Sequence, residues 1–179
     1  MSTIKTRNDF LSIIPKNSKC CEIGVFRGDY SKLIYNICNP SLLCLVDIFH
    51  GKGYSGDKDG LNIVHSDDMN LFYNDLTEYY KNNLNVKIFK IDSANFLKNI
   101  PNNFFDFIYI DGDHSFDGVY SDLTLSYEKL KLGGILSGHD YHESIGGVLP
   151  AVDRFFYEKK LKLNTTEEDL LPTFWTVKE

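Results

Sequence analysis

Short apolar runs alternate with longer amphipathic stretches along this chain, and this alternation limits its possible folds more than any other feature. The runs expected to form strands are Lys19–Ile23, Leu42–Val46, Val86–Ile91, Phe105–Ile110 and Ile135–Ser137. The stretches expected to form helices are Arg7–Ile14, Tyr30–Ile37, Asp67–Lys81, Ala94–Asn99, Ser115–Leu130 and Val148–Lys159. Strands that alternate with helices predict a parallel sheet joined by crossover helices.

The C-terminal part of the chain departs from this alternation. The last two apolar runs, Leu161–Leu163 and Phe174–Val177, have no helix between them and are expected to form an antiparallel hairpin. Gly133 and Gly134 are expected to end the helix before the fifth strand. Together these features predict a doubly wound, Rossmann-like α/β sheet of about seven strands, mostly parallel, with a C-terminal antiparallel hairpin.

One polar stretch, Gly51 to Gly60, follows the second predicted strand. It is too rich in glycine for a helix or a central strand, so a loop is expected there. A loop that leaves the carboxyl end of a strand can close over a ligand as a lid, or it can be an ordinary surface loop. The sequence leaves both interpretations open.

Composition narrows the class of protein. A chain of 179 residues with 42% hydrophobic residues is sufficient for one domain, residues 1–179, with a real core. A net charge of −6 and the absence of a basic patch disfavour binding to nucleic acid. No signal peptide or membrane-length apolar run is found, so a soluble, cytoplasmic protein is expected. The cysteines form no CxxC pair, which makes a zinc site unexpected.

The turn after the first strand reads CEIGVFRG, residues 21–28, and is a candidate ligand site. Gly24 and Gly28 allow positive φ and a close approach to the backbone, and the next helix begins with unpaired N–H groups. Glu22 would repel a pyrophosphate but suits a cationic sulfonium or amino group, which favours S-adenosylmethionine (SAM) over a dinucleotide. The alternative is a strand-to-helix turn whose glycines serve packing alone.

Polar residues also end the next two strands. Asp47 lies about twenty residues beyond the glycines, where a doubly wound site places an acid against ribose hydroxyls. Asp92 and Ser93 can meet an adenine edge, with Ile48 or Phe49 against its face. For Asp92, the cap of a helix is an equally good interpretation.

The reaction end is predicted from two motifs, IDGDH at 110–114 and GHDYH at 138–142. Neighbouring strands would bring both motifs to the carboxyl edge of the sheet. Asp111, His139 and Asp140 are therefore candidate ligands for one divalent cation, Mg²⁺ or Mn²⁺. Asp111 is also counted among the candidate cofactor contacts.

Histidines in these motifs are candidate general bases. His114, His139 and His142 can each accept a proton near neutral pH, and His139 can serve as a base only if it is not a metal ligand. The alternative is that Asp113 or Ser115 caps the following helix and that the other side chains are solvated.

These motifs resemble the class I SAM-dependent methyltransferases, and among them a bacterial-type group typified by macrocin-type sugar O-methyltransferases. The matching stretches, which cover nearly the whole chain, are EIGVFRGDYS at 22–31, LVDIF at 45–49, IDSANFL at 91–97, FIYIDGDHSFDGVYSDL at 107–123, LKLGGILSGHDY at 130–141, GVLPAVDRFF at 147–156 and FWTVKE at 174–179. The resemblance implies a seven-stranded sheet with a reversed last strand. It implies cofactor contacts from Glu22, Gly24, Asp47 and Ser93, and metal positions at Asp111 and the His139-Asp140 pair.

The expected function is therefore metal-assisted transfer of a methyl group from SAM to a hydroxyl of a sugar or other small molecule. The alternatives are a metal-independent methyltransferase with His114 or His139 as base, a non-catalytic nucleotide-binding protein, and a nicotinamide dehydrogenase. The last is disfavoured because the glycine spacing departs from G-x-G-x-x-G. The expected partner is a small-molecule acceptor, with no nucleic acid and no membrane. A homodimer is left open.

Overall fold

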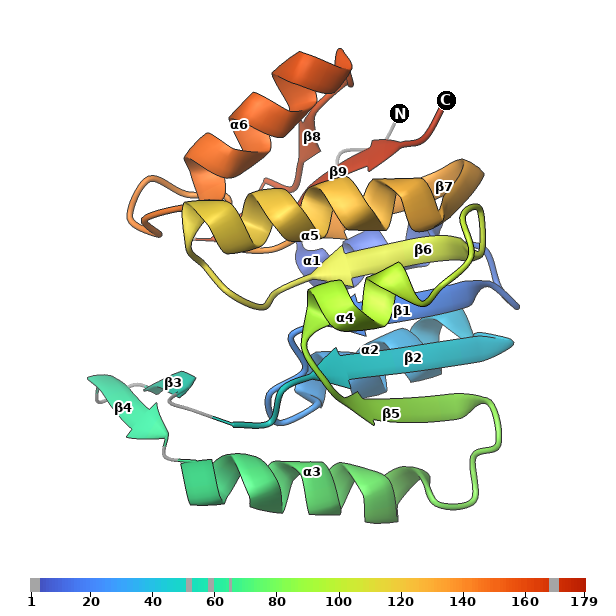
Figure 1. Ribbon diagram of the computed structural model, residues 1–179, viewed down its shortest axis with the longest axis vertical. Helices are drawn as coiled ribbons and strands as arrows, with labels where there is room; N and C mark the ends of the chain where they lie inside the picture. The colour runs from blue at the N-terminus through green and yellow to red at the C-terminus, as the bar shows by residue number, and fades with distance from the viewer. Residues whose placement is uncertain (1–3, 51–52, 58–59, 65, 168–170) are drawn as a thin grey trace.

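The computed structural model describes residues 4–50, 53–57, 60–64, 66–167 and 171–179. Its main sheet is built from β1 Lys19–Ile23, β2 Leu42–Asp47, β5 Val86–Lys90, β6 Phe105–Ile110, β7 Leu130–Gly138, β8 Asn164–Thr165 and β9 Phe174–Val177. The helices are α1 Arg7–Phe10, α2 Asp29–Cys38, α3 Ser66–Tyr80, α4 Ser93–Lys98, α5 Phe116–Lys129 and α6 Val148–Lys159, with a 3₁₀ turn η1 Leu11–Ile13 after α1. Figure 1 shows the sheet between two layers of helices.

The strand order is β5-β2-β1-β6-β7-β9-β8. The five strands from β5 to β7 are parallel, whereas β9 runs antiparallel to β7 and to β8. The chain first builds outward from β1 to β2 and β5, then crosses back to β6 on the other side of β1. The predicted doubly wound, mostly parallel fold is confirmed, and the switch point between β1 and β6 is where such sheets bind ligands.

Each face of the sheet has its own apolar core. On one face α4, α5 and α6 pack on side chains that include Ile108, Leu123 and Phe155. On the other face η1, α2 and α3 pack around Phe107 and Leu45. This double cover explains why the central strands are apolar on both sides. The four cysteines, Cys20, Cys21, Cys38 and Cys44, are buried free thiols.

Two predicted boundaries near the C-terminus are wrong. The strand predicted at Ile135–Ser137 begins at Leu130, directly after α5, so Gly133 and Gly134 lie inside β7 and do not end the helix. The pairing of β7 with β6 is irregular between Phe105 and Phe107, which accommodates Gly133 at φ +76°. The C-terminal hairpin is present, but its first strand is Asn164–Thr165 and not Leu161–Leu163.

The polar stretch at 51–60 is not simply a loop. Residues 51–52 and 58–59 lie outside the described residues, but β3, Gly53–Asp57, pairs antiparallel with β4, Gly60–Val64. The two strands form a separate sheet beyond the carboxyl end of β2 (Figure 1). Exclusion of a central strand was correct, whereas the edge pairing was missed because the partner strand lies just beyond the glycine-rich stretch. Closure of this segment over a ligand stays a prediction. Among the described residues, no helix has the length and apolar character to span a membrane.

Candidate active site

The turn after β1 is shaped by two glycines with positive φ. Gly24 has φ +82°, and a Cβ there would lie 2.0 Å from the carbonyl oxygen of Asp111 at the end of β6. Gly28 has φ +74°, and its Cβ would lie 2.2 Å from the side chain of Leu76 in α3. Both glycines are therefore needed for packing. Contact with a cofactor carboxylate remains a prediction for each.

Asp47 ties the end of β2 to this turn. Its half-buried carboxylate accepts the N–H groups of Val25 at 2.8 Å, Phe26 at 3.0 Å and Phe49 at 2.7 Å. A carboxylate offers about four acceptor positions, so capacity remains for a ribose hydroxyl. The predicted ribose contact is thus compatible with the geometry, but the side chain also has a structural role that the sequence did not indicate.

Glu22 is a carboxyl group enclosed beneath α2. Its residue is 2% exposed, and it accepts a hydrogen bond from the Ser31 hydroxyl in the first turn of that helix. Burial raises the pKa of Glu22 to about 8, against the opposing hydrogen bond from Ser31. A nearby cation would stabilise the ionised form of this buried acid further than the single hydrogen bond from Ser31 does.

The residues after β5 combine capping with a buried polar contact. Asp92 is the N-cap of α4 and accepts the Asn95 N–H at 3.0 Å, so the capping interpretation is confirmed for it. The Ser93 hydroxyl donates to Asp122 of α5 at 2.6 Å. Asp122 is 3% exposed, and burial raises its pKa to about 6 against the hydrogen bond from Ser93. This pair joins α4 to α5 beside the predicted adenine position.

The two candidates for contact with an adenine face differ in exposure. Ile48 is 51% exposed at the end of β2 and is available to a ligand. Phe49 is wrong as a candidate because it is fully buried and packs against Tyr73 of α3, with ring centroids 5.2 Å apart. The backbone of Phe49 has φ +43°, a left-handed conformation, just after the end of β2.

The ends of β6 and β7 bring the predicted reaction residues together. One ligand atom from each of Asp111, His139 and Asp140 lies within 4.8 Å of the others. His139 Nδ1 is 2.7 Å from one Asp140 carboxylate oxygen. His114 Nε2 is 3.0 Å from the other Asp140 oxygen and 3.6 Å from an Asp111 oxygen. Two carboxylates and two imidazoles therefore converge at one point on the sheet edge.

Protonation differs sharply within this group. Contacts with Asp111 and Asp140 raise the pKa of His114 to about 10, although partial burial opposes them. Burial alone would raise the pKa of Asp140, but the hydrogen bonds from His114 and His139 outweigh it and hold that pKa well below its usual value. These contacts favour the protonated form of His114, and its role as a general base stays a prediction.

Two other polar residues of these motifs, Asp113 and His142, make hydrogen bonds to residues close to them in sequence. Asp113 accepts the Ser115 N–H at 2.8 Å and the Ser115 hydroxyl at 2.9 Å, and Ser115 is the N-cap of α5. The capping interpretation is thus confirmed for Ser115, whose hydroxyl accepts the Gly118 N–H at 3.1 Å, whereas Asp113 only holds Ser115 in place. His142 contacts the Ser144 hydroxyl at 2.8 Å through Nδ1, in the loop that leads to α6.

Comparison with known families identifies this arrangement. A family described as a methyltransferase domain matches residues 21–141, which include the turn after β1 and the ends of β6 and β7. The chain belongs to this methyltransferase family. The family and the strand order together show a methyltransferase domain with the class I fold. No match is found among curated protein sequences.

Solved structures share the fold of this methyltransferase at low sequence identity. A chain from Clostridium thermocellum described as an rRNA-methylase has 16% identity and TM-score 0.68, over 99% of this chain and 100% of that one. A Streptococcus mutans protein described as a methyltransferase, in complex with S-adenosylhomocysteine (SAH), has 13% identity and TM-score 0.64 over 95% of both chains. Spermidine synthase from Thermotoga maritima has 18% identity and TM-score 0.62, over 95% of this chain. The methyltransferase spans only 55% of that synthase.

The structure adds three polar residues to the site that sequence reasoning missed. Ser31 and Asp122 are the buried partners of Glu22 and Ser93. Arg7 of α1 places a guanidinium nitrogen 3.9 Å from an Asp111 carboxylate oxygen. For Asp122 a signal existed, because it lies beside Val119 and Leu123 on the apolar face of its helix. For Arg7 no local pattern points to a contact more than a hundred residues away.

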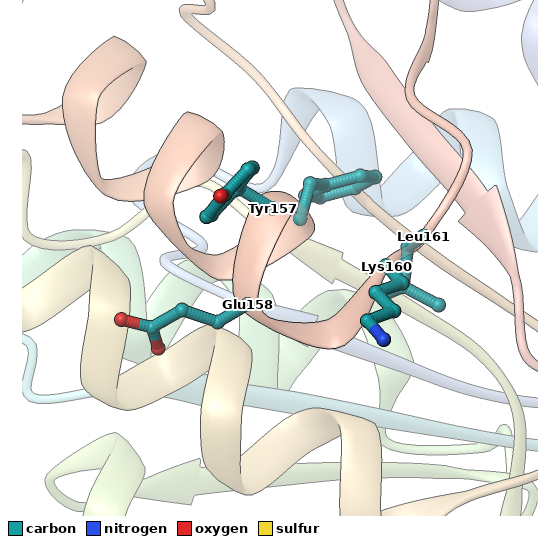
Figure 2. A pocket seen from close by; sticks show the side chains of 5 residues that line it. Tyr157, Glu158, Lys160 and Leu161 are labelled. Atoms are coloured by element: carbon teal, nitrogen blue, oxygen red, sulfur yellow. The ribbon is translucent and has the colours of Figure 1, made fainter.

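A surface pocket of about 470 Å³ lies away from this site (Figure 2). It is lined by Phe156, Tyr157, Glu158, Lys160 and Leu161. These residues are at the C-terminal end of the 12-residue α6, whereas the N-terminal end of that helix follows the GHDYH loop. A helix of that length spans about 18 Å. The pocket is therefore not the place where the strand-end residues of the methyltransferase gather.

Proposed function

We propose that this methyltransferase transfers the methyl group of SAM to a hydroxyl of a small-molecule acceptor such as a sugar, with a divalent cation held by Asp111, His139 and Asp140. One observation carries the proposal: ligand atoms of these three residues lie within 4.8 Å of one another at the carboxyl ends of β6 and β7. This position adjoins the glycine turn, because the Asp111 N–H donates to the Ile23 carbonyl at 2.7 Å.

The residues around β1 and β2 fit SAM. Glu22 is a buried carboxyl whose raised pKa marks an uncompensated acid, and the ammonium of the methionine moiety would compensate it. Asp47 retains acceptor capacity for the ribose, and Ile48 exposes an apolar side chain for the adenine. Ser93 adjoins the same edge of the sheet. We assign Glu22, Gly24, Gly28, Asp47, Ile48, Asp92, Ser93 and Asp111 as the cofactor-binding set.

The donor set fits a hard or borderline divalent cation. Two carboxylates suit Mg²⁺, and an imidazole nitrogen makes Mn²⁺ acceptable as well. Asp140 has a left-handed backbone conformation with φ +62°, and its carboxylate is buried, the residue being 7% exposed. Strained backbone of this kind is concentrated at functional sites.

The chain's own residues perform the positioning. SAM would supply a methyl group on a cationic sulfur: the acceptor oxygen would take the methyl carbon, the carbon–sulfur bond would break so that SAH leaves, and a neighbouring histidine or carboxylate would take the hydroxyl proton. A cation at Asp111 and Asp140 would lower the pKa of the acceptor hydroxyl and fix its position. Because Gly24 lies directly against the backbone of Asp111, the proposed SAM site and the proposed acceptor site would adjoin each other. Alignment of the two reactants is the main contribution required of the protein.

A second candidate mechanism needs no metal, and one contact favours it. The 2.7 Å distance between His139 Nδ1 and Asp140 is that of a histidine oriented by a carboxylate. With its Nδ1 proton directed at Asp140, His139 would accept the hydroxyl proton through Nε2. His139 cannot accept the hydroxyl proton while it is bound to a metal ion. The two mechanisms therefore exclude one another.

Chelation separates the two mechanisms. We expect EDTA to abolish transfer of a labelled methyl group from SAM to a panel of hydroxyl acceptors, and added Mn²⁺ or Mg²⁺ to restore it. SAH affinity should change little, because all the proposed cofactor contacts except Asp111 lie on other strand ends. Full activity in EDTA would reject the metal and leave the His139 base in its place.

A further inference from the structure

Ser93 and Asp122 form a polar contact between two helices on one face of the sheet. The two helices, α4 and α5, pack against each other there (Figure 1). Asp122 is 3% exposed, in a part of α5 whose residues Val119 and Leu123 are also buried. The half-buried Ser93, the first residue of α4, donates its hydroxyl proton to an Asp122 carboxylate oxygen at 2.6 Å. The hydroxyl proton of Ser93 is therefore directed into the protein.

A carboxylate is a costly way to join these helices. Burial raises the pKa of Asp122 to about 6, against the hydrogen bond from Ser93, and the negative charges of Asp92 and Asp113 raise it further. An apolar side chain of similar shape would join the helices without the cost of burying a charge. What the carboxylate adds to the contact is a fixed direction for the hydroxyl proton of Ser93.

The order of the strands bears on which part of the cofactor Ser93 would meet. In the proposed site the methionine moiety lies at the turn after β1 and the ribose at Asp47, which ends β2. The next strand outward is β5, and the Ile91 N–H just after it donates to the Asp47 carbonyl at 3.0 Å. Neighbouring strands are about 4.8 Å apart, so a base attached to that ribose would reach the residues after β5. Ser93 is two residues beyond Ile91.

A serine hydroxyl has one proton and two acceptor positions. Because Asp122 takes the proton, Ser93 Oγ can only accept a hydrogen bond from a ligand. Adenine carries an amino group at position 6, which donates, whereas hypoxanthine and guanine carry a carbonyl oxygen there, which accepts. We propose that Asp122 is a positioning residue that makes Ser93 an acceptor for the 6-amino group of adenine, so that the site selects adenosine cofactors over 6-oxopurine counterparts. The inference rests on the proposed function, because it takes SAM to bind along β1, β2 and β5.

The test compares SAH with S-inosylhomocysteine, which carries hypoxanthine in place of adenine. It is made at about pH 8, where Asp122 is ionised because its pKa is about 6. Calorimetry should show SAH binding at least about tenfold tighter, because Ser93 has no proton for the carbonyl oxygen of hypoxanthine and an unpaired polar group is costly. Equal binding of the two ligands, or tighter binding of S-inosylhomocysteine, would overturn this inference alone. Failure of SAH to bind would reject the proposed cofactor site together with it.

Variants of the pair distinguish recognition from packing through the ratio of the two affinities. Ser93→Ala should bring the ratio close to one. Asp122→Leu leaves the hydroxyl free to donate, and the amide of Asp122→Asn can itself donate to Ser93, so both should lower the ratio. The double variant Ser93→Ala, Asp122→Leu should match Ser93→Ala, because Asp122 acts through Ser93. A contact that served packing alone would weaken both ligands equally, so an unchanged ratio in Ser93→Ala, or in both Asp122 variants, would overturn the inference.

Asp117→Asn is the matched control. It removes the same charge from the same helix, but Asp117 is exposed in the first turn of α5. Both affinities and their ratio should match those of the wild type. A fall in the ratio as large as that in Asp122→Asn would indicate a general effect of charge and would also overturn the inference.

Discussion

Gly24→Ala is expected to lower the free energy of unfolding by about 3 kcal/mol and to abolish SAH binding. The positive φ of residue 24 costs an alanine about 1–2 kcal/mol, and overpacking typically adds about 1–3 kcal/mol. The added Cβ would lie 2.0 Å from the Asp111 carbonyl oxygen, which is backbone and cannot move aside like a side chain. Urea denaturation measures the first effect, and calorimetry at a temperature where the variant is folded measures the second.

Two other glycines provide matched controls. Gly133 has φ +76°, close to the value at Gly24, but nothing lies within 4 Å of its added Cβ. Gly133→Ala therefore carries the conformational cost without the clash and should keep SAH binding. Gly146 has neither feature, so Gly146→Ala should resemble the wild type. If Gly24→Ala were no less stable than Gly133→Ala, the close approach of Gly24 to the Asp111 backbone would be refuted.

Asp140→Asn is expected to reduce methyl transfer by about 100-fold while SAH binding persists. Loss of about 3 kcal/mol of metal-derived stabilisation corresponds to that factor. Asparagine suits the test because it tolerates the left-handed conformation of residue 140, so the backbone should be preserved. Mn²⁺ affinity, measured by electron paramagnetic resonance, should fall in parallel with activity.

Asp113→Asn is the control for this substitution. It makes the same change of charge in the neighbouring motif, but Asp113 contacts Ser115 and lies outside the three-residue cluster. Its activity and Mn²⁺ affinity should stay close to those of the wild type. Equal losses in both variants would indicate a general electrostatic effect, and a fully active Asp140→Asn would contradict the proposed ligand set.

Most of the fold is predictable because its pattern is local. Apolar runs such as Leu42–Val46 and amphipathic stretches such as Val148–Lys159 specify element type by their periodicity. Errors arise where tertiary pairing overrides local propensity. Gly133 and Gly134 belong to β7 because β6 pairs with residues on either side of them, and Gly53–Asp57 is a strand because β4 follows it.

The site is predictable as far as topology brings strand ends together. Asp47, Asp111 and Asp140 each follow a strand, and parallel strands gather such residues at one edge. The order of the strands does not predict how a side chain is oriented or which residues far apart in sequence come into contact. The inward turn of Phe49 depends on one positive φ, and the approach of Arg7 to Asp111 depends on how α1 packs.

The measurement that tests the account most directly is calorimetric titration of the protein with SAH and, separately, with NAD. We expect one SAH site per chain, with affinity at least about tenfold greater than for NAD, because an ammonium of the methionine moiety would stabilise the ionised form of the buried Glu22, whereas a pyrophosphate would not. Asp47→Ala should weaken SAH binding, since it removes the proposed charge-assisted ribose contact and the hydrogen bonds that hold the turn after β1. Equal affinity for NAD and SAH, or undiminished SAH binding by Asp47→Ala, would contradict the assignment of the cofactor site.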